Sequence, residues 1–155
     1  MTAQAAPSMS RWSGQATSPA ASQQPIDAVR LVLDSSVIID HLRGDDRARQ
    51  LISAAFTAGD ELWSVTAARV EILGGIRSGE ERETHRLLAM ISWLDVTTDV
   101  ADLAGRDAAR FRRSHGAIDT VDYLLAAAVD VLGAELRTQN VRHFPMIPGL
   151  APAYE

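Results

Sequence analysis

The chain lacks cysteine, lysine and any long apolar run, and each absence excludes a class of protein or site. Because none of the 155 residues is cysteine, the chain can have no disulfide framework, no thiolate metal site and no thiol nucleophile. A metal ion would have to be held by oxygen or imidazole ligands. No apolar run approaches the roughly 20 residues that span a bilayer. We therefore expect a cytosolic protein that has no membrane partner.

All fifteen basic residues are arginine, and the net charge is −5. A negative net charge argues against a protein that coats nucleic acid nonspecifically, because such binding depends on neutralising phosphates. The net charge does not exclude a local basic rim. Arginine supplies planar, bidentate phosphate donors, but a codon bias toward GC-rich DNA explains the missing lysine equally well.

The composition changes near residue 29. Residues 1–28 are rich in Ala, Ser, Gln and Pro without a sustained period, and they predict a disordered leader that does not read as a secretory signal. From Val29 onward, short apolar runs alternate with helical patterns, which is typical of an α/β domain. We expect one domain over residues 29–155.

Local patterns predict the elements of this domain. The strands are expected at residues 30–34, 61–65, 93–96 and 135–138. The helices are expected to run from the first strand to a stop at Gly44, then over residues 45–59, from a cap at Thr66 to a loose end near Gly74, and over residues 80–91, 99–116 and 119–132. Asp99 is expected to cap the helix that begins with it.

Four acids stand where elements begin or end. Asp34 closes an apolar strand, at the sheet edge where open α/β folds bind ligands; alternatively it only caps the next helix. Glu71 has apolar neighbours, which suggests a helix packed on two sides where an acid needs a partner or a metal; alternatively it is an ordinary exposed glutamate.

Asp119 and Asp122 are three residues apart, so in a helix their like charges lie side by side. They are either a helix cap and a first-turn acid or part of one anionic pocket with the other two acids. Carboxylates gathered in such a pocket can form an oxygen cage for Mg²⁺ or Mn²⁺. Thr138, Gln139 and Asn140 follow the last predicted strand and could orient these acids without adding charge, or simply form a turn.

Four segments in this order resemble the motifs of PIN-domain nucleases, and the resemblance within that superfamily is to the VapC toxins. The segments are Leu31–Ile38 (LVLDSSVI), Ser64–Glu71 (SVTAARVE), Asp119–Ala127 (DTVDYLLAA) and Thr138–Pro145 (TQNVRHFP). The resemblance covers Val29 to the C-terminus. It implies an α/β fold whose short central parallel sheet has four to five strands flanked by helices.

The resemblance also implies Mg²⁺-dependent endonucleolytic cleavage of RNA, with 5′-phosphate and 3′-hydroxyl products. It assigns Asp34, Glu71 and Asp122 as metal ligands and Asp119 as an outer or second-metal acid, with Thr138 and Asn140 orienting them. Many members have an acid where this chain has His143, so Asp119 could supply the missing carboxylate.

The implied partners are RNA and a cognate VapB-type antitoxin, in homodimers or toxin–antitoxin hetero-oligomers. An acidic pocket needs a basic rim to hold RNA, and the arginines proposed for it are Arg43, Arg110, Arg112, Arg113 and Arg142. Arg110, Arg112 and Arg113 could equally be a solvated helix end. Leu51, Ile52 and Phe56 either line an antitoxin groove or, as most apolar stripes do, face the protein's own core.

Two other functions remain open at this stage. A catalytically degenerate PIN module, or a receiver-like one, would bind partners without cutting RNA. A phosphatase-like enzyme of the haloacid-dehalogenase type would also start with an acid after the first strand. That chemistry needs a second acid two residues later, where this chain has Ser36.

Overall fold

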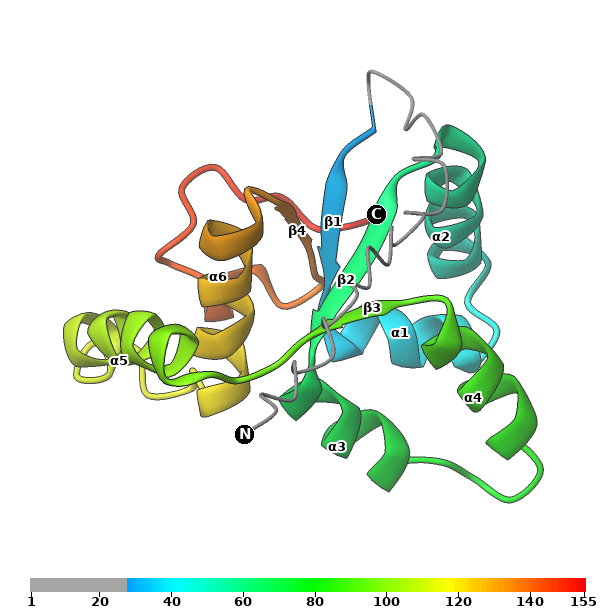
Figure 1. Ribbon diagram of the computed structural model, residues 1–155, viewed down its shortest axis with the longest axis horizontal. Coiled ribbons are helices and arrows are strands. Elements are labelled where there is room, and N and C mark those ends of the chain that lie inside the picture. Colours follow the sequence, from blue (N-terminus) through cyan, green and yellow to red (C-terminus); the bar gives the residue numbers. More distant parts are fainter. Residues whose placement is uncertain (1–27) are drawn as a thin grey trace, which may run out of the picture.

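The computed structural model describes residues 28–155 as a four-stranded parallel sheet with helices on both faces (Figure 1). The predicted leader lies outside the described residues, apart from its last position. The strand order is β3-β2-β1-β4, and the strands are β1 (Arg30–Leu33), β2 (Glu61–Val65), β3 (Ser92–Leu94) and β4 (Glu135–Arg137). The predicted α/β class and the four predicted strands are confirmed.

In the described residues, six α-helices connect the strands and one short 3₁₀ helix follows the last strand. They are α1 (Ser35–Leu42), α2 (Asp46–Ala58), α3 (Thr66–Gly74), α4 (Glu81–Ala89), α5 (Thr98–Phe111), α6 (Thr120–Leu132) and η1 (Val141–His143). Between residues 28 and 155, no helix has both the length and the apolar composition needed to cross a membrane.

Strand β1 is apolar at successive positions because the sheet is covered on both faces. Val32 packs into a core shared with α5 and α6, whereas Leu31 and Leu33 pack into a second core with α1, α2 and α4. Figure 1 shows the two layers, with α5 and α6 on one side of the sheet and α1 to α4 on the other. The two cores hold the strand ends between two layers of helices.

Parallel pairing brings the carboxyl ends of β1 and β4 to the same edge. Leu33 is paired in register with Arg137, and the Asp34 backbone N–H donates to the Arg137 carbonyl oxygen at 3.0 Å. Asp34 and Thr138 are the next residues of the two strands. The register therefore places them side by side, although 104 positions separate them in the sequence.

Several predicted boundaries need correction. Thr66 is the first residue of α3 and not its cap, a position that Val65 takes without a side-chain hydrogen bond. Helix α5 is capped by Thr97, whose hydroxyl accepts from the Val100 N–H, and not by Asp99. It ends at Phe111 rather than near Gly116. Strand β3 covers residues 92–94, so it begins one residue earlier and ends two residues earlier than predicted.

Both ends of α2 follow the prediction closely. The Asp45 side chain caps the helix by accepting from the Arg47 N–H, and Gly59 follows the helix in the left-handed region at φ 76°. Glycine adopts this conformation without the steric cost of a Cβ.

Ile52 lies in the core, Leu51 packs against it, and Phe56 is 42% exposed. The core interpretation thus holds for Leu51 and Ile52 only.

Candidate functional site

Asp34 is a buried acid whose carboxylate is held by hydroxyl groups. Its exposed fraction is 3%, and its Oδ2 accepts from Thr138 Oγ1 at 2.7 Å and from Ser36 Oγ at 3.0 Å. Asp34 occupies the position before α1, but its side chain makes no capping hydrogen bond to that helix. The alternative that it serves only as a helix cap therefore fails for its side chain.

Ser35 connects Asp34 to Glu71. Its hydroxyl donates to Glu71 Oε2 at 2.7 Å and lies 3.4 Å from Asp34 Oδ1. A hydroxyl has a single proton to donate. The shorter distance shows that this proton is directed to Glu71, and the contact with Asp34 is the weaker one. The second and first motifs thus meet at the carboxyl edge of the sheet.

The prediction that Glu71 lies on a helix packed on two sides is wrong. Glu71 is exposed, and its neighbour Val70 is 73% exposed. Helix α3 buries Ala68 and Ile72, one turn apart, and the residues between them turn away from that face. Exposure places the Glu71 carboxylate at the rim of the site, where water and a substrate can reach it.

Asp119 and Asp122 form a capping box at the start of α6. The Asp119 Oδ1 accepts from the Asp122 N–H at 3.0 Å, and the Asp122 Oδ2 accepts from the Asp119 N–H at 3.1 Å. Asp119 is exposed, whereas Asp122 is only 6% exposed. The cap-and-first-turn alternative therefore describes Asp119 well, but it leaves the burial of Asp122 unexplained.

The Asp122 carboxyl has a strongly raised pKa. Burial is the main cause, the neighbouring negative charges of Asp119 and Asp34 add to it, and together they raise the pKa to about 6. The hydrogen bond from the Asp119 backbone and the charge of His143 act in the opposite direction. The ionised form of Asp122 is costly because it lies close to other acids in a desolvated place.

His143 is a partner of Asp122 that the sequence did not identify. Its Nδ1 lies 3.1 Å from the Asp122 Oδ2, and η1 brings it there from beyond β4. When Asp122 is ionised, its carboxylate only accepts hydrogen bonds, so the contact then needs a proton on Nδ1. The sequence offered no signal for it, because 21 residues separate the pair.

The turn after β4 acts on Asp34 mainly through Thr138, which is fully buried. The Asn140 backbone N–H donates to Thr138 Oγ1 at 2.9 Å, and the Gln139 backbone N–H donates to Ser36 Oγ at 3.4 Å. Asn140 thus contacts the site through its backbone. The expected orienting role remains a prediction for its side chain.

The five arginines of the predicted rim are all exposed but lie in three places. Arg142 is in η1 beside His143, and Arg112 and Arg113 follow the end of α5, where Arg110 stacks on Phe111 at 5.0 Å. Arg43 follows α1, about 12 Å along that helix from Asp34. Arg142 is thus the sequence neighbour of the residue that contacts Asp122, whereas Arg43 lies beyond the far end of α1.

The carboxylates at this edge of the sheet could bind a divalent ion without forming a closed cage. Within residues 28–155, no three His, Asp or Glu side chains converge into a closed metal cage. Mg²⁺ does not need one, because it keeps several waters and is usually bound by one or two carboxylates plus substrate phosphates. In the same part of the chain, Asp34 has no salt bridge and Asp122 has one only to His143. Two buried, mutually repelling carboxylates suit a hard cation.

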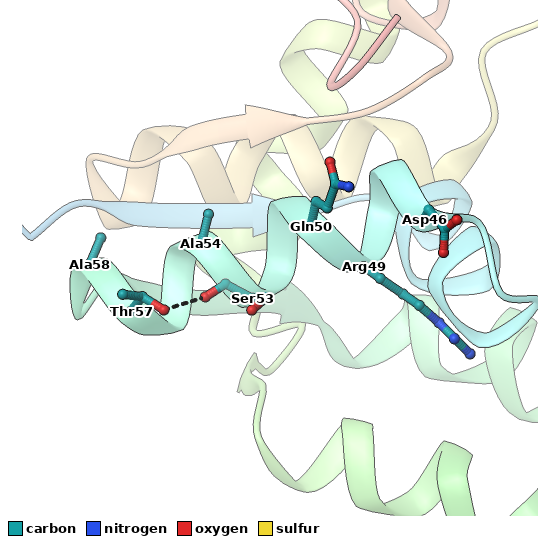
Figure 2. Close-up of a pocket in the computed structure, with 7 residues that line it drawn as sticks. All are labelled: Asp46, Arg49, Gln50, Ser53, Ala54, Thr57 and Ala58. Carbon is teal, nitrogen blue, oxygen red and sulfur yellow. Dashed lines mark hydrogen bonds between the residues drawn. The ribbon is translucent and has the colours of Figure 1, made fainter.

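A separate surface hollow lies on α2 and does not contain these acids. It is lined by Asp46, Arg49, Gln50, Ser53, Ala54, Thr57 and Ala58. Figure 2 shows that all seven side chains come from this one helix. The only hydrogen bond drawn between them runs from the Thr57 hydroxyl to the Ser53 carbonyl oxygen, at 3.0 Å within the helix. The hollow has none of the features of a chemical site.

Comparisons with known proteins agree with this geometry. The sequence profile described as "PIN domain" matches residues 31–146. Ribonuclease VapC19 of Mycobacterium tuberculosis is 42% identical over 123 residues, which cover 79% of this chain and 98% of VapC19. Ribonuclease VapC10 of the same organism is 42% identical over 124 residues, which cover 80% of this chain and 92% of VapC10.

Solved structures share the fold at lower sequence identity. A toxin–antitoxin complex from Klebsiella pneumoniae matches with a TM-score of 0.64 and 21% identity, over 81% of this chain and 98% of that chain. VapBC2 from Rickettsia felis, bound to a DNA fragment from its promoter, matches with a TM-score of 0.64 and 16% identity, over 79% of this chain and 96% of that chain. The chain belongs to the PIN-domain family and, within it, to the VapC ribonucleases.

Proposed function

We propose that this chain is the toxin of a VapBC pair, an Mg²⁺-dependent endoribonuclease that hydrolyses RNA phosphodiester bonds and so inhibits translation and growth. Mn²⁺ substitutes for Mg²⁺. The observation that carries the proposal is the pair of buried carboxylates, Asp34 and Asp122, which no arginine of residues 28–155 neutralises. The toxin acts in the cytoplasm, where it meets RNA and a VapB-type antitoxin, with which it forms hetero-oligomers.

Asp34 and Asp122 are the proposed inner metal ligands. A divalent ion bound there supplies positive charge for the scissile phosphate and makes a water molecule acidic enough to attack at neutral pH. Thr138 and Ser36 hold the Asp34 carboxylate by hydrogen bonds to Oδ2, and Oδ1 has only the longer 3.4 Å contact with the Ser35 hydroxyl. His143 and the Asp119 N–H hold Asp122 through its Oδ2 in the same way.

Glu71 and Asp119 are the proposed outer acids. Both are exposed, and each is linked to one inner acid: Glu71 to Asp34 through the Ser35 hydroxyl, and Asp119 to Asp122 through the capping box. An exposed carboxylate can accept a proton from water or hold a hydrated ion without the desolvation cost that Asp122 bears. Arg142, the sequence neighbour of His143, is a proposed contact for an RNA phosphate.

Metal binding by the purified full chain tests this function. We expect Asp34→Asn and Asp122→Asn to lower the Mn²⁺ affinity and to reduce RNA cleavage by about a hundredfold or more, because each removes a charged ligand. Asp46→Asn is the matched control, since Asp46 is an exposed acid on the α2 hollow (Figure 2). It should bind Mn²⁺ and cleave RNA as the wild type does.

Growth of bacteria that express the chain without its antitoxin gives a second readout. Wild type should arrest growth, and Asp34→Ala or Asp122→Ala should relieve the arrest. Wild-type toxicity in both variants would contradict the proposed chemistry. Normal Mn²⁺ binding without any cleavage of RNA would instead support the degenerate binding module.

A further inference from the structure

The segment formed by residues 153–155 is fastened to the turn after β4 by paired hydrogen bonds. The Ala153 N–H donates to the Thr138 carbonyl oxygen at 2.9 Å. The Gln139 side-chain amide donates to the Tyr154 carbonyl oxygen at 3.0 Å and accepts from the Tyr154 N–H at 3.2 Å. The Gln139 side chain thus pairs with Tyr154 as a neighbouring strand would.

The Tyr154 side chain ties the same segment to the helices on one face of the sheet. Its hydroxyl donates to Asp40 Oδ2 on α1 at 2.5 Å. The Arg47 guanidinium of α2 lies 5.3 Å from the Tyr154 ring centre and donates to the Glu155 carbonyl oxygen at 2.8 Å. Ala153 and Tyr154 also pack against the core that these helices share.

The turn held in this way is the one that orients the hydroxyls around Asp34. The backbone N–H groups of Gln139 and Asn140 donate to Ser36 Oγ and Thr138 Oγ1, respectively. Each hydroxyl has one proton, so a donor bound to its oxygen directs that proton elsewhere. Both hydroxyls direct it to the Asp34 Oδ2.

We propose that Gln139 and Tyr154 are positioning residues, which clasp the turn after β4 against α1 and thereby fix the hydroxyls that hold Asp34 in the metal-binding geometry. Neither side chain hydrogen-bonds to the proposed metal ligands. The proposal rests on the proposed function for the role of Asp34. It extends the site to residues 153–155, beyond the four motifs.

The affinity of the purified full chain for Mn²⁺ tests the clasp, together with RNA cleavage and thermal unfolding. Gln139→Ala should lower the affinity about tenfold, as loss of outer-shell support does. Tyr154→Phe keeps the backbone pairing with Gln139 but loses the bond to Asp40, and it should lower the affinity about threefold. In both variants the cleavage rate lost at limiting metal should return at saturating metal.

Two further variants serve as controls. Asp40→Asn is a conservative variant within the clasp, and its Mn²⁺ affinity should exceed that of Tyr154→Phe, since its amide oxygen can still accept from the Tyr154 hydroxyl. Gln50→Ala, an exposed glutamine of the α2 hollow (Figure 2), should leave Mn²⁺ affinity and cleavage unchanged. A purely structural role for the clasp would lower the unfolding temperature without changing the metal affinity.

Each outcome decides for or against the clasp. Wild-type Mn²⁺ affinity in both Gln139→Ala and Tyr154→Phe overturns the clasp. If Asp34→Asn loses Mn²⁺ affinity in the same experiment, the proposed function still stands. Wild-type affinity in Asp34→Asn itself would overturn the metal site and the clasp together. Should Gln139→Ala fail to fold, a lower Mn²⁺ affinity of Tyr154→Phe than of Gln50→Ala supports the clasp, and equal affinities of these two variants overturn it.

Discussion

At the scale of residues, the site is set apart by acids that are oriented but not neutralised. Asp45 shows the contrast, because hydrogen bonds from Arg47 lower its pKa to about 2. Asp34 receives neutral hydroxyls instead, and burial raises the pKa of Asp122 to about 6. Neutral donors fix the direction of a carboxylate but leave its charge for a cation.

The raised pKa of Asp122 predicts a pH dependence of metal binding. Protons compete with the ion for this carboxylate, so the Mn²⁺ affinity should be nearly constant above pH 7 and should fall about tenfold per pH unit below about 6. Isothermal titration at pH 5, 6 and 7.5 would measure it. An unchanged affinity across this range would show that Asp122 does not bind the ion.

The same shift predicts a stability difference in metal-free protein. The folded pKa of Asp122 lies above the unfolded value, so the folded state binds more protons, and stability is lost as pH rises from about 4 through 6. Asp122→Asn has no such charge. It should therefore unfold at a higher temperature than wild type at pH 7.5 without metal, and this advantage should be absent at pH 4. Differential scanning calorimetry would measure it.

At the scale of elements, the start of α6 combines a capping role with the proposed metal-binding role of Asp122. The capping box joins an exposed Asp119 to a buried Asp122, so the turn that begins the helix also directs the inner acid. We expect Asp119→Ala to destabilise the fold by about 1 kcal/mol through loss of the cap. Its effect on Mn²⁺ affinity should be smaller than that of Asp122→Asn. Urea unfolding and metal titration would measure the two effects.

Asp119→Ser separates the two roles of Asp119. Serine is also a good cap, so this variant should recover most of the stability that alanine loses. A Mn²⁺ affinity that stays low in Asp119→Ser, despite recovered stability, would assign Asp119 a direct metal role.

Most elements could be predicted because their signals are local. The apolar run of β1, the Asp45 cap and Gly59 mark their elements within a few residues. The start of α5 was missed because Thr97 and Asp99 are both good caps, and only the backbone angles decide between them. The end of α5 was missed because residues 112–116 contain no strong helix breaker before Gly116.

At the scale of the whole molecule, two cores hold the strand ends that carry the site. Leu125 is fully buried between the sheet and α5, whereas Val131 of the same helix is 48% exposed. Leu125→Ala should lower the free energy of unfolding by about 2 to 5 kcal/mol. Val131→Ala is the matched control and should change it by less than about 0.5 kcal/mol. Similar losses in the two variants, measured by urea unfolding, would contradict the packing described for α6.

The membership of the site could be predicted only in part. Asp34, Asp122 and Thr138 follow from motif position, and the structure brings the hydroxyl of Thr138 to Asp34. Their partners Ser36 and His143 could not be assigned, because a serine after a strand or a histidine in a tail has many uses. The apolar residues beside Glu71 wrongly predicted a helix packed on two sides. Whether they are buried depends on which elements pack against α3.

The sequence alone determined the class of fold and the order of its elements, and it singled out the candidate acids, because periodicity, caps and strand ends act over a few neighbouring residues. Only the tertiary structure decided which acids are buried, which hydroxyls hold them and how Tyr154 reaches α1. Those contacts join residues up to 114 positions apart. They exist because parallel strand pairing aligns one edge of the sheet, a long-range arrangement that no local pattern specifies.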